Sequence, residues 1–60
     1  MEQHTPSPRE TAARLLEITP NIDIAIATCD KIMKMSSLRW VRTHYLLAKG
    51  YLLLHKYMAL

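Results

Sequence analysis

The sequence predicts an all-α fold of three helices, and three observations carry that prediction. Apolar residues recur at helical spacing, and Leu, Ile, Met and Ala outnumber Val and the aromatic residues. A single glycine and the absence of hairpin dipeptides argue against β-structure. Polar breaks divide the chain into a short N-terminal helix and an antiparallel helical hairpin, with helices expected at about 8–18, 21–35 and 37–59. We expect residues 1–6 to form a flexible tail and residues 7–60 a single small domain.

The first helix is expected to begin directly after Ser7. The Ser7 side chain can accept a hydrogen bond from the amide of Glu10, and Pro8 suits the first helical position. The apolar residues on one side form the predicted inner face of this helix: Ala12, Leu15 and Leu16.

A break is expected around Pro20, and two interpretations are open. Thr19 could cap a new helix with Pro20 at its first position, or one long helix could continue through a kink. We favour the break, because proline disfavours helical geometry at the residue before it and lacks an amide donor.

The second helix is expected from about Ile22 to Met35. Asp23 near its start and Lys34 near its end suit the helix dipole. Cys29, the only cysteine, cannot form a disulfide within the chain and is interpreted as a small buried hydrophobe. The predicted inner face consists of Ile22, Ala25, Ile26, Cys29, Ile32 and Met33.

Ser36 and Ser37 are expected to end the second helix and to cap the third. A polar link of two residues suffices for an antiparallel helical hairpin. The third helix carries apolar residues almost all round, with Leu46, Leu53 and Tyr57 opposite the main apolar side. Such a helix must be buried almost all round.

A chain of 60 residues cannot by itself bury so much apolar surface. We therefore expect self-association, most simply as a dimer whose two hairpins form a helical bundle. The expected interface residues lie on the third helix: Trp40, Val41, Tyr45, Leu47, Tyr51, Leu52, Leu54 and Met58.

No group of residues in the sequence commits to a particular chemistry. Cys29 stands alone, and the three histidines lack the short spacings that zinc ligands need. The five acidic residues are spread along the chain, and no glycine-rich phosphate loop is present. We expect a non-enzymatic protein without a cofactor or a metal.

A basic stripe on the third helix offers an alternative function. Four cations, spaced so that they share one side of the helix, could follow a phosphate backbone or could simply be the solvated face. The net charge of +3 is modest, so nucleic-acid binding is the less favoured interpretation. The candidate contacts are Arg39, Arg42, Lys49 and Lys56.

Membrane association is also less favoured. Trp40 and the tyrosines suit a membrane surface, but the upstream helices can cover the apolar side. No apolar segment approaches the ~20 residues that span a bilayer. The first 20 residues carry charges without the apolar core of a signal peptide. We therefore expect a cytoplasmic protein.

His44 and His55 border the main apolar side of the third helix. They are interpreted as boundary residues; the sharper hypothesis places them in an oligomer interface that weakens when they are protonated. Taken together, the sequence predicts a small protein–protein interaction module. We expect a homo-oligomeric regulatory or accessory factor, of a bacterial or temperate-phage type, that binds a larger protein. The alternative of a structural fragment that folds only within a larger assembly stays open.

Overall fold

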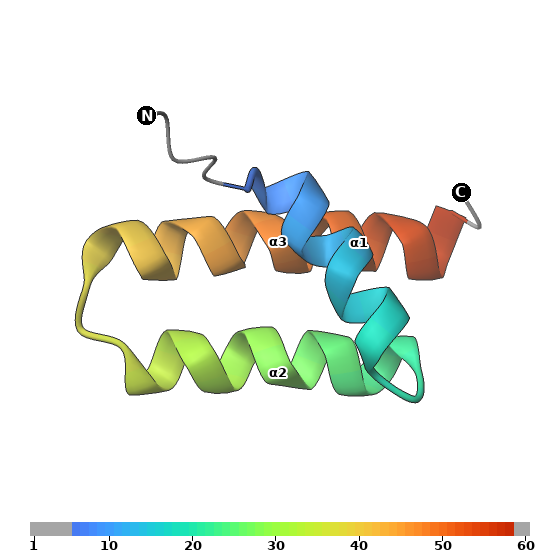
Figure 1. Cartoon of the computed structure of the whole chain (residues 1–60), viewed down its shortest axis with the longest axis horizontal. Helices are drawn as coiled ribbons and strands as arrows, with labels where there is room; N and C mark the ends of the chain where they lie inside the picture. The colour runs from blue at the N-terminus through green and yellow to red at the C-terminus, as the bar shows by residue number, and fades with distance from the viewer. Residues whose placement is uncertain (1–5, 59–60) are drawn as a thin grey trace, which may run out of the picture.

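The computed structural model describes residues 6–58, which form three helices and contain no strand (Figure 1). The helices are α1 (Pro8–Ile18), α2 (Ile22–Met35) and α3 (Arg39–Met58). The all-α prediction is confirmed. The expected N-terminal tail falls almost wholly outside the described residues, as does the predicted last residue of the third helix.

The start of α1 follows the capping pattern predicted from the sequence. Ser7 has an extended backbone, and its Oγ accepts a hydrogen bond from the amide of Glu10 at 3.2 Å. Pro8 occupies the first turn, where a missing amide proton costs nothing because that proton would have no partner within the helix.

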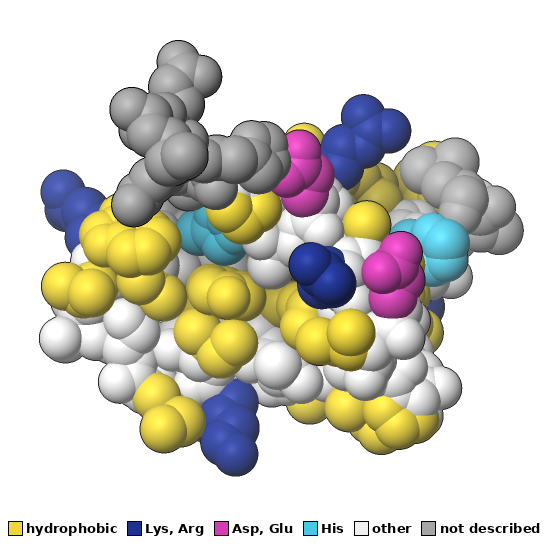
Figure 2. Space-filling view, in the orientation of Figure 1, with side chains coloured by type: hydrophobic (Ala, Val, Ile, Leu, Met, Phe, Trp, Pro, Cys, Tyr) yellow, Lys and Arg dark blue, Asp and Glu magenta, His cyan; other side chains and the backbone are white. Residues whose placement is uncertain are grey.

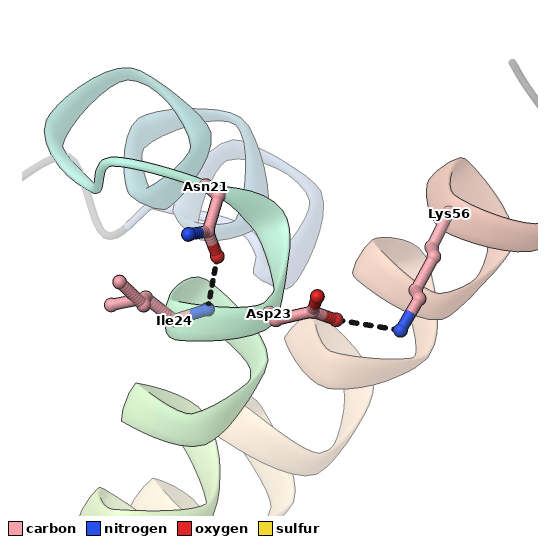
Figure 3. A network of polar contacts seen from close by, with 4 residues as sticks. All are labelled: Asn21, Asp23, Ile24 and Lys56. Carbon is pink, nitrogen blue, oxygen red and sulfur yellow. Dashed lines mark hydrogen bonds and ion pairs between the residues drawn. The ribbon is translucent and has the colours of Figure 1, made fainter.

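The chain breaks between α1 and α2 rather than continuing through a kink. Thr19 ends α1 in an extended conformation, and its amide donates to the Leu15 carbonyl at 3.0 Å. The expected cap of the second helix was Thr19, and this is corrected: Asn21 is the cap, because its Oδ1 accepts from the amide of Ile24 at 3.0 Å (Figure 3). The Thr19 hydroxyl is instead used at the end of α1, where it donates to Leu15.

The link between α2 and α3 is one residue longer than predicted. Ser36 ends α2, and its Oγ accepts from the amide of Leu38 at 3.2 Å. Helix α3 begins at Arg39, directly after Leu38. The Leu38 carbonyl then accepts from the amide of Arg42 at 3.1 Å.

The two longer helices pack along each other, and α1 crosses them (Figure 1). Helix α3 contacts both α1 and α2, whereas α1 and α2 contact each other only slightly. The buried core takes two residues from each helix: Ala12, Leu15, Ala25, Cys29, Ala48 and Leu52. Three of the six are alanines, so the helices approach closely around a thin core. Partly buried Leu16, Ile22, Ile26 and Tyr45 pack against it.

Polar contacts join α2 to α3. Two ion pairs join α2 to α3: Lys49 Nζ lies 2.7 Å from Asp30 Oδ1, and Lys56 Nζ lies 2.6 Å from Asp23 Oδ1 (Figure 3). Lys49 and Asp30 are 19 positions apart in the sequence, and Lys56 and Asp23 are 33 positions apart.

None of the helices among the described residues has the length and apolar character that crossing a bilayer requires.

Candidate protein-interaction surface

The side of α3 that faces away from α1 and α2 is apolar and open to solvent. We call this surface the outer face of α3. Its large apolar side chains are between 45% and 73% exposed. They are Trp40, Leu46, Leu47, Tyr51, Leu54, Tyr57 and Met58.

Helix geometry explains why these residues share one side. Ala48 and Leu52 are fully buried and mark the inner side of α3. At about 100° per residue, Gly50 lies opposite the midpoint between them, and Leu47 and Leu54 lie next to Gly50 on the helical wheel. The packing of two helices on one side of α3 therefore leaves the opposite side uncovered.

The structure divides the predicted interface set into three groups. Five members are exposed on the outer face: Trp40, Leu47, Tyr51, Leu54 and Met58. Leu52 is corrected, because it is fully buried in the core of its own chain and cannot reach a partner. Val41 and Tyr45 are half-buried, and Tyr45 packs against that core.

Three residues of the outer face were not in the predicted interface. The sequence pattern places Leu46 and Tyr57 opposite the main apolar side of the third helix. In the structure both are exposed and belong to the outer face. Gly50 has no apolar side chain to signal an interface. A lone glycine amid a strongly apolar helical sector is the signal that could have identified it.

The outer face is hollowed along its length. The central hollow is lined by Gly50 together with Leu46, Leu47, Tyr51 and Leu54. The hollow nearer the start of α3 shares Leu47 with it, and the hollow bordered by α1 shares Tyr51 and Leu54. Neighbouring hollows therefore share lining residues, and we call the three together the apolar groove.

Other apolar side chains reach the surface in separate groups. Figure 2 shows them on the side that α1 crosses, with charged side chains and backbone atoms between them. Ile18 and Met35, near the ends of α1 and α2, are also exposed. Isolated exposed apolar residues are common in folded proteins, whereas a continuous apolar stripe is not.

The predicted basic stripe is split by the fold. Lys49 and Lys56 are ion-paired with Asp30 and Asp23, so two of its four cations are neutralised within the chain. The hydrogen bond that Lys56 donates to Asp23 is the largest of the effects that raise the pKa of Lys56.

Arg39 and Arg42 are exposed at the start of α3. They border a hollow that Met33 and Thr43 also line. Nucleic-acid binding stays a prediction, now resting on these two arginines. Retention on a filter that falls as salt is raised would support it.

The two histidines of α3 have different surroundings. His44 lies between α3 and α1, where its Nε2 shares a hydrogen bond with Thr11 Oγ1 at 2.6 Å. Its ring also meets Tyr45 edge-on, with the ring centroids 5.2 Å apart. His55 is exposed and lines the hollow bordered by α1. His44 thus joins α3 to α1 and also lines the hollow nearer the start of α3, whereas His55 is the more exposed of the two.

The described residues bring together few side chains that could bind a metal ion or take part in a reaction. Residues 6–58 contain no cluster of three or more side chains that could hold a metal ion. Among the same residues, no buried side-chain polar atom lacks a hydrogen-bond partner. Cys29 is buried, and this burial, followed by the charge of Asp30, raises the pKa of its thiol. No protein-family model, curated protein or solved structure matches the chain.

Proposed function

We propose that this chain is a small non-enzymatic protein–protein interaction module. It self-associates through the outer face of α3 and acts as a regulatory or accessory factor by binding a larger protein. The observation that carries the proposal is the continuous apolar surface on the side of α3 that neither α1 nor α2 covers.

The size of this surface supports the proposal. With about 200 Å² for each large side chain, the exposed portions of its seven residues amount to roughly 800 Å². The largest apolar patch on a typical monomer is about 300–600 Å². A standard protein interface takes about 800 Å² from each partner. The outer face is therefore larger than a monomer usually exposes and about as large as one half of a stable interface.

The composition of the outer face also supports the proposal. It contains Trp40, Tyr51, Tyr57 and Met58, which belong to the residue types that are enriched at the centres of interfaces. Between Thr43 and Leu54, no charged residue lies on this side of the helix. Depletion of charge at the centre of a patch is the compositional mark of an interface core.

Sedimentation equilibrium over a wide range of chain concentrations tests the proposal. We expect the apparent mass to rise from 7.0 kDa to twice that value. Trp40, the only tryptophan, is 65% exposed in the single chain, so its fluorescence should shift to shorter wavelength as dimers form.

Leu47→Glu is the matching variant, and it should keep the chain monomeric because it places a charge at the centre of the apolar groove. Ile24→Glu is the control, because Ile24 is exposed to a similar extent on α2 and should be dispensable for association. A 7.0 kDa particle at every concentration, or equal association by both variants, would refute the proposal.

A further inference from the structure

We infer that the occupant of the outer face is a second copy of α3 that packs antiparallel and crosses the first at Gly50. This inference rests on the proposed self-association and adds its geometry. It also assigns a role to Gly50, which would permit the two helix backbones to approach closely at the crossing.

Among residues 6–58, no contact accounts for a glycine at this position. Glycine is the least favourable residue for a helix interior apart from proline, yet Gly50 lies in the middle of α3. A Cβ atom built at Gly50 would meet nothing within 4 Å, so packing within the described part of the chain does not exclude a side chain. Its missing side chain instead leaves a notch in the floor of the central hollow. Small residues at a helix crossing allow a short distance between the two axes.

Two leucines of the outer face are placed symmetrically about the notch. Leu46 and Leu54 lie four residues before and four residues after Gly50. Trp40 and Met58 lie near the two ends of the same face. A two-fold axis through Gly50 would place Leu46 of each copy against Leu54 of the other. Such a self-complementary surface is what a symmetric dimer requires.

Charge selects the antiparallel direction. Arg39 and Arg42 are exposed in the first turn of α3, and the helix contains no acidic residue. A parallel arrangement would bring the arginines of both copies together. An antiparallel arrangement places them beside the C-terminal end of the other α3, where the helix dipole favours cations. Lys56, in the same end, is paired with Asp23 on the side facing α2 and does not oppose them.

Substitution at Gly50 separates this geometry from helix stability. Gly50→Ala should raise the melting temperature of the dilute monomer, because alanine favours the helix and meets open space. The same change should weaken dimerisation, and Gly50→Leu should raise the dimer dissociation constant by at least about tenfold. Ala27→Leu places the same side chain on the exposed side of α2 and should leave that constant unchanged.

Disulfide trapping tests the direction. In a Cys29→Ala background, chains carrying Leu46→Cys are mixed with chains carrying Leu54→Cys and oxidised. The antiparallel crossing predicts mainly the mixed disulfide, whereas a parallel crossing predicts disulfides between identical chains. Predominance of identical pairs would overturn the inference, as would an unchanged dissociation constant for Gly50→Leu, while the proposed self-association would survive both. A wild-type chain that stays monomeric at every concentration would overturn both the proposed self-association and the antiparallel crossing. The same holds if the monomeric chain binds a different protein.

Discussion

Small side chains determine how closely the three helices approach. Ala12, Ala25 and Ala48 are nearly or fully buried, one from each helix. Cys29 fills the remaining space beside them as a buried thiol, as expected from its position in the apolar pattern. The six core side chains are small or apolar, and none of them carries a formal charge in the folded state.

The first prediction concerns Cys29. Because burial raises the pKa of its thiol, the folded chain holds this proton more tightly than the unfolded chain does. The resulting stabilisation is complete below the ordinary thiol pKa of about 8.5 and is lost as the pH rises above it. We expect the difference in free energy of unfolding between wild type and Cys29→Ala to shrink between about pH 7 and pH 9.5. Urea denaturation of both chains at the two pH values measures it, and a constant difference would contradict the prediction.

At the scale of the elements, local signals and long-range contacts have separate roles. Ser7, Asn21 and Ser36 each satisfy a backbone amide near a helix end, within three residues along the chain. Such short-range bonds position the ends of the helices, and most of them were predictable. The docking of α1 on α3 depends instead on Leu15 and on the contact between Thr11 and His44.

The second prediction concerns this docking. Thr11→Val keeps the shape of the side chain but removes the hydrogen bond to His44. We expect it to lower the free energy of unfolding by about 0.5–1.5 kcal/mol. Thr28→Val is the control, because the Thr28 hydroxyl donates only within α2, to the Ile24 carbonyl at 2.8 Å. Chemical denaturation of both variants provides the comparison, and equal losses would show that the contact between α1 and α3 adds nothing.

At the scale of the whole molecule, the core is thin and much apolar surface lies outside it. Two buried residues from each helix make a small core even for a chain of 60 residues. Chains of this size usually need a metal, a disulfide or an oligomer to be stable. An oligomer formed at the outer face would add apolar burial to the side of α3 that the core does not use.

The third prediction separates the core from the outer face. Leu52→Ala should lower the free energy of unfolding by about 2–5 kcal/mol, because Leu52 is fully buried. Leu47→Ala should change the stability of the dilute monomer by less than about 0.5 kcal/mol, because Leu47 is 52% exposed.

In wild type, the melting temperature should rise with chain concentration, and Leu47→Ala should flatten this dependence. Thermal melts at two widely separated concentrations measure both effects. If Leu47→Ala were as destabilising as Leu52→Ala at low concentration, the division between core and outer face would be wrong.

The sequence by itself determined the helical class, the approximate extent of each helix and the inner sides of α1 and α2. The reason is that these depend on interactions within about four residues and on the spacing of apolar residues around a helix with one polar side. Ser7, Pro20 and Cys29 could be interpreted in this way. The assignment of the α2 cap to Asn21 instead of Thr19 required the backbone conformation, since both side chains can act as caps.

Only the tertiary structure decided which sector of α3 is buried. Because α3 is apolar almost all round, its pattern is compatible with an inner side centred on Leu52 or on Leu47. The close packing of two helices selects the sector that contains Ala48, where a small side chain leaves room for both. The same packing joins Lys49 and Lys56 to acids far away in the sequence and leaves Gly50 at the centre of the uncovered face.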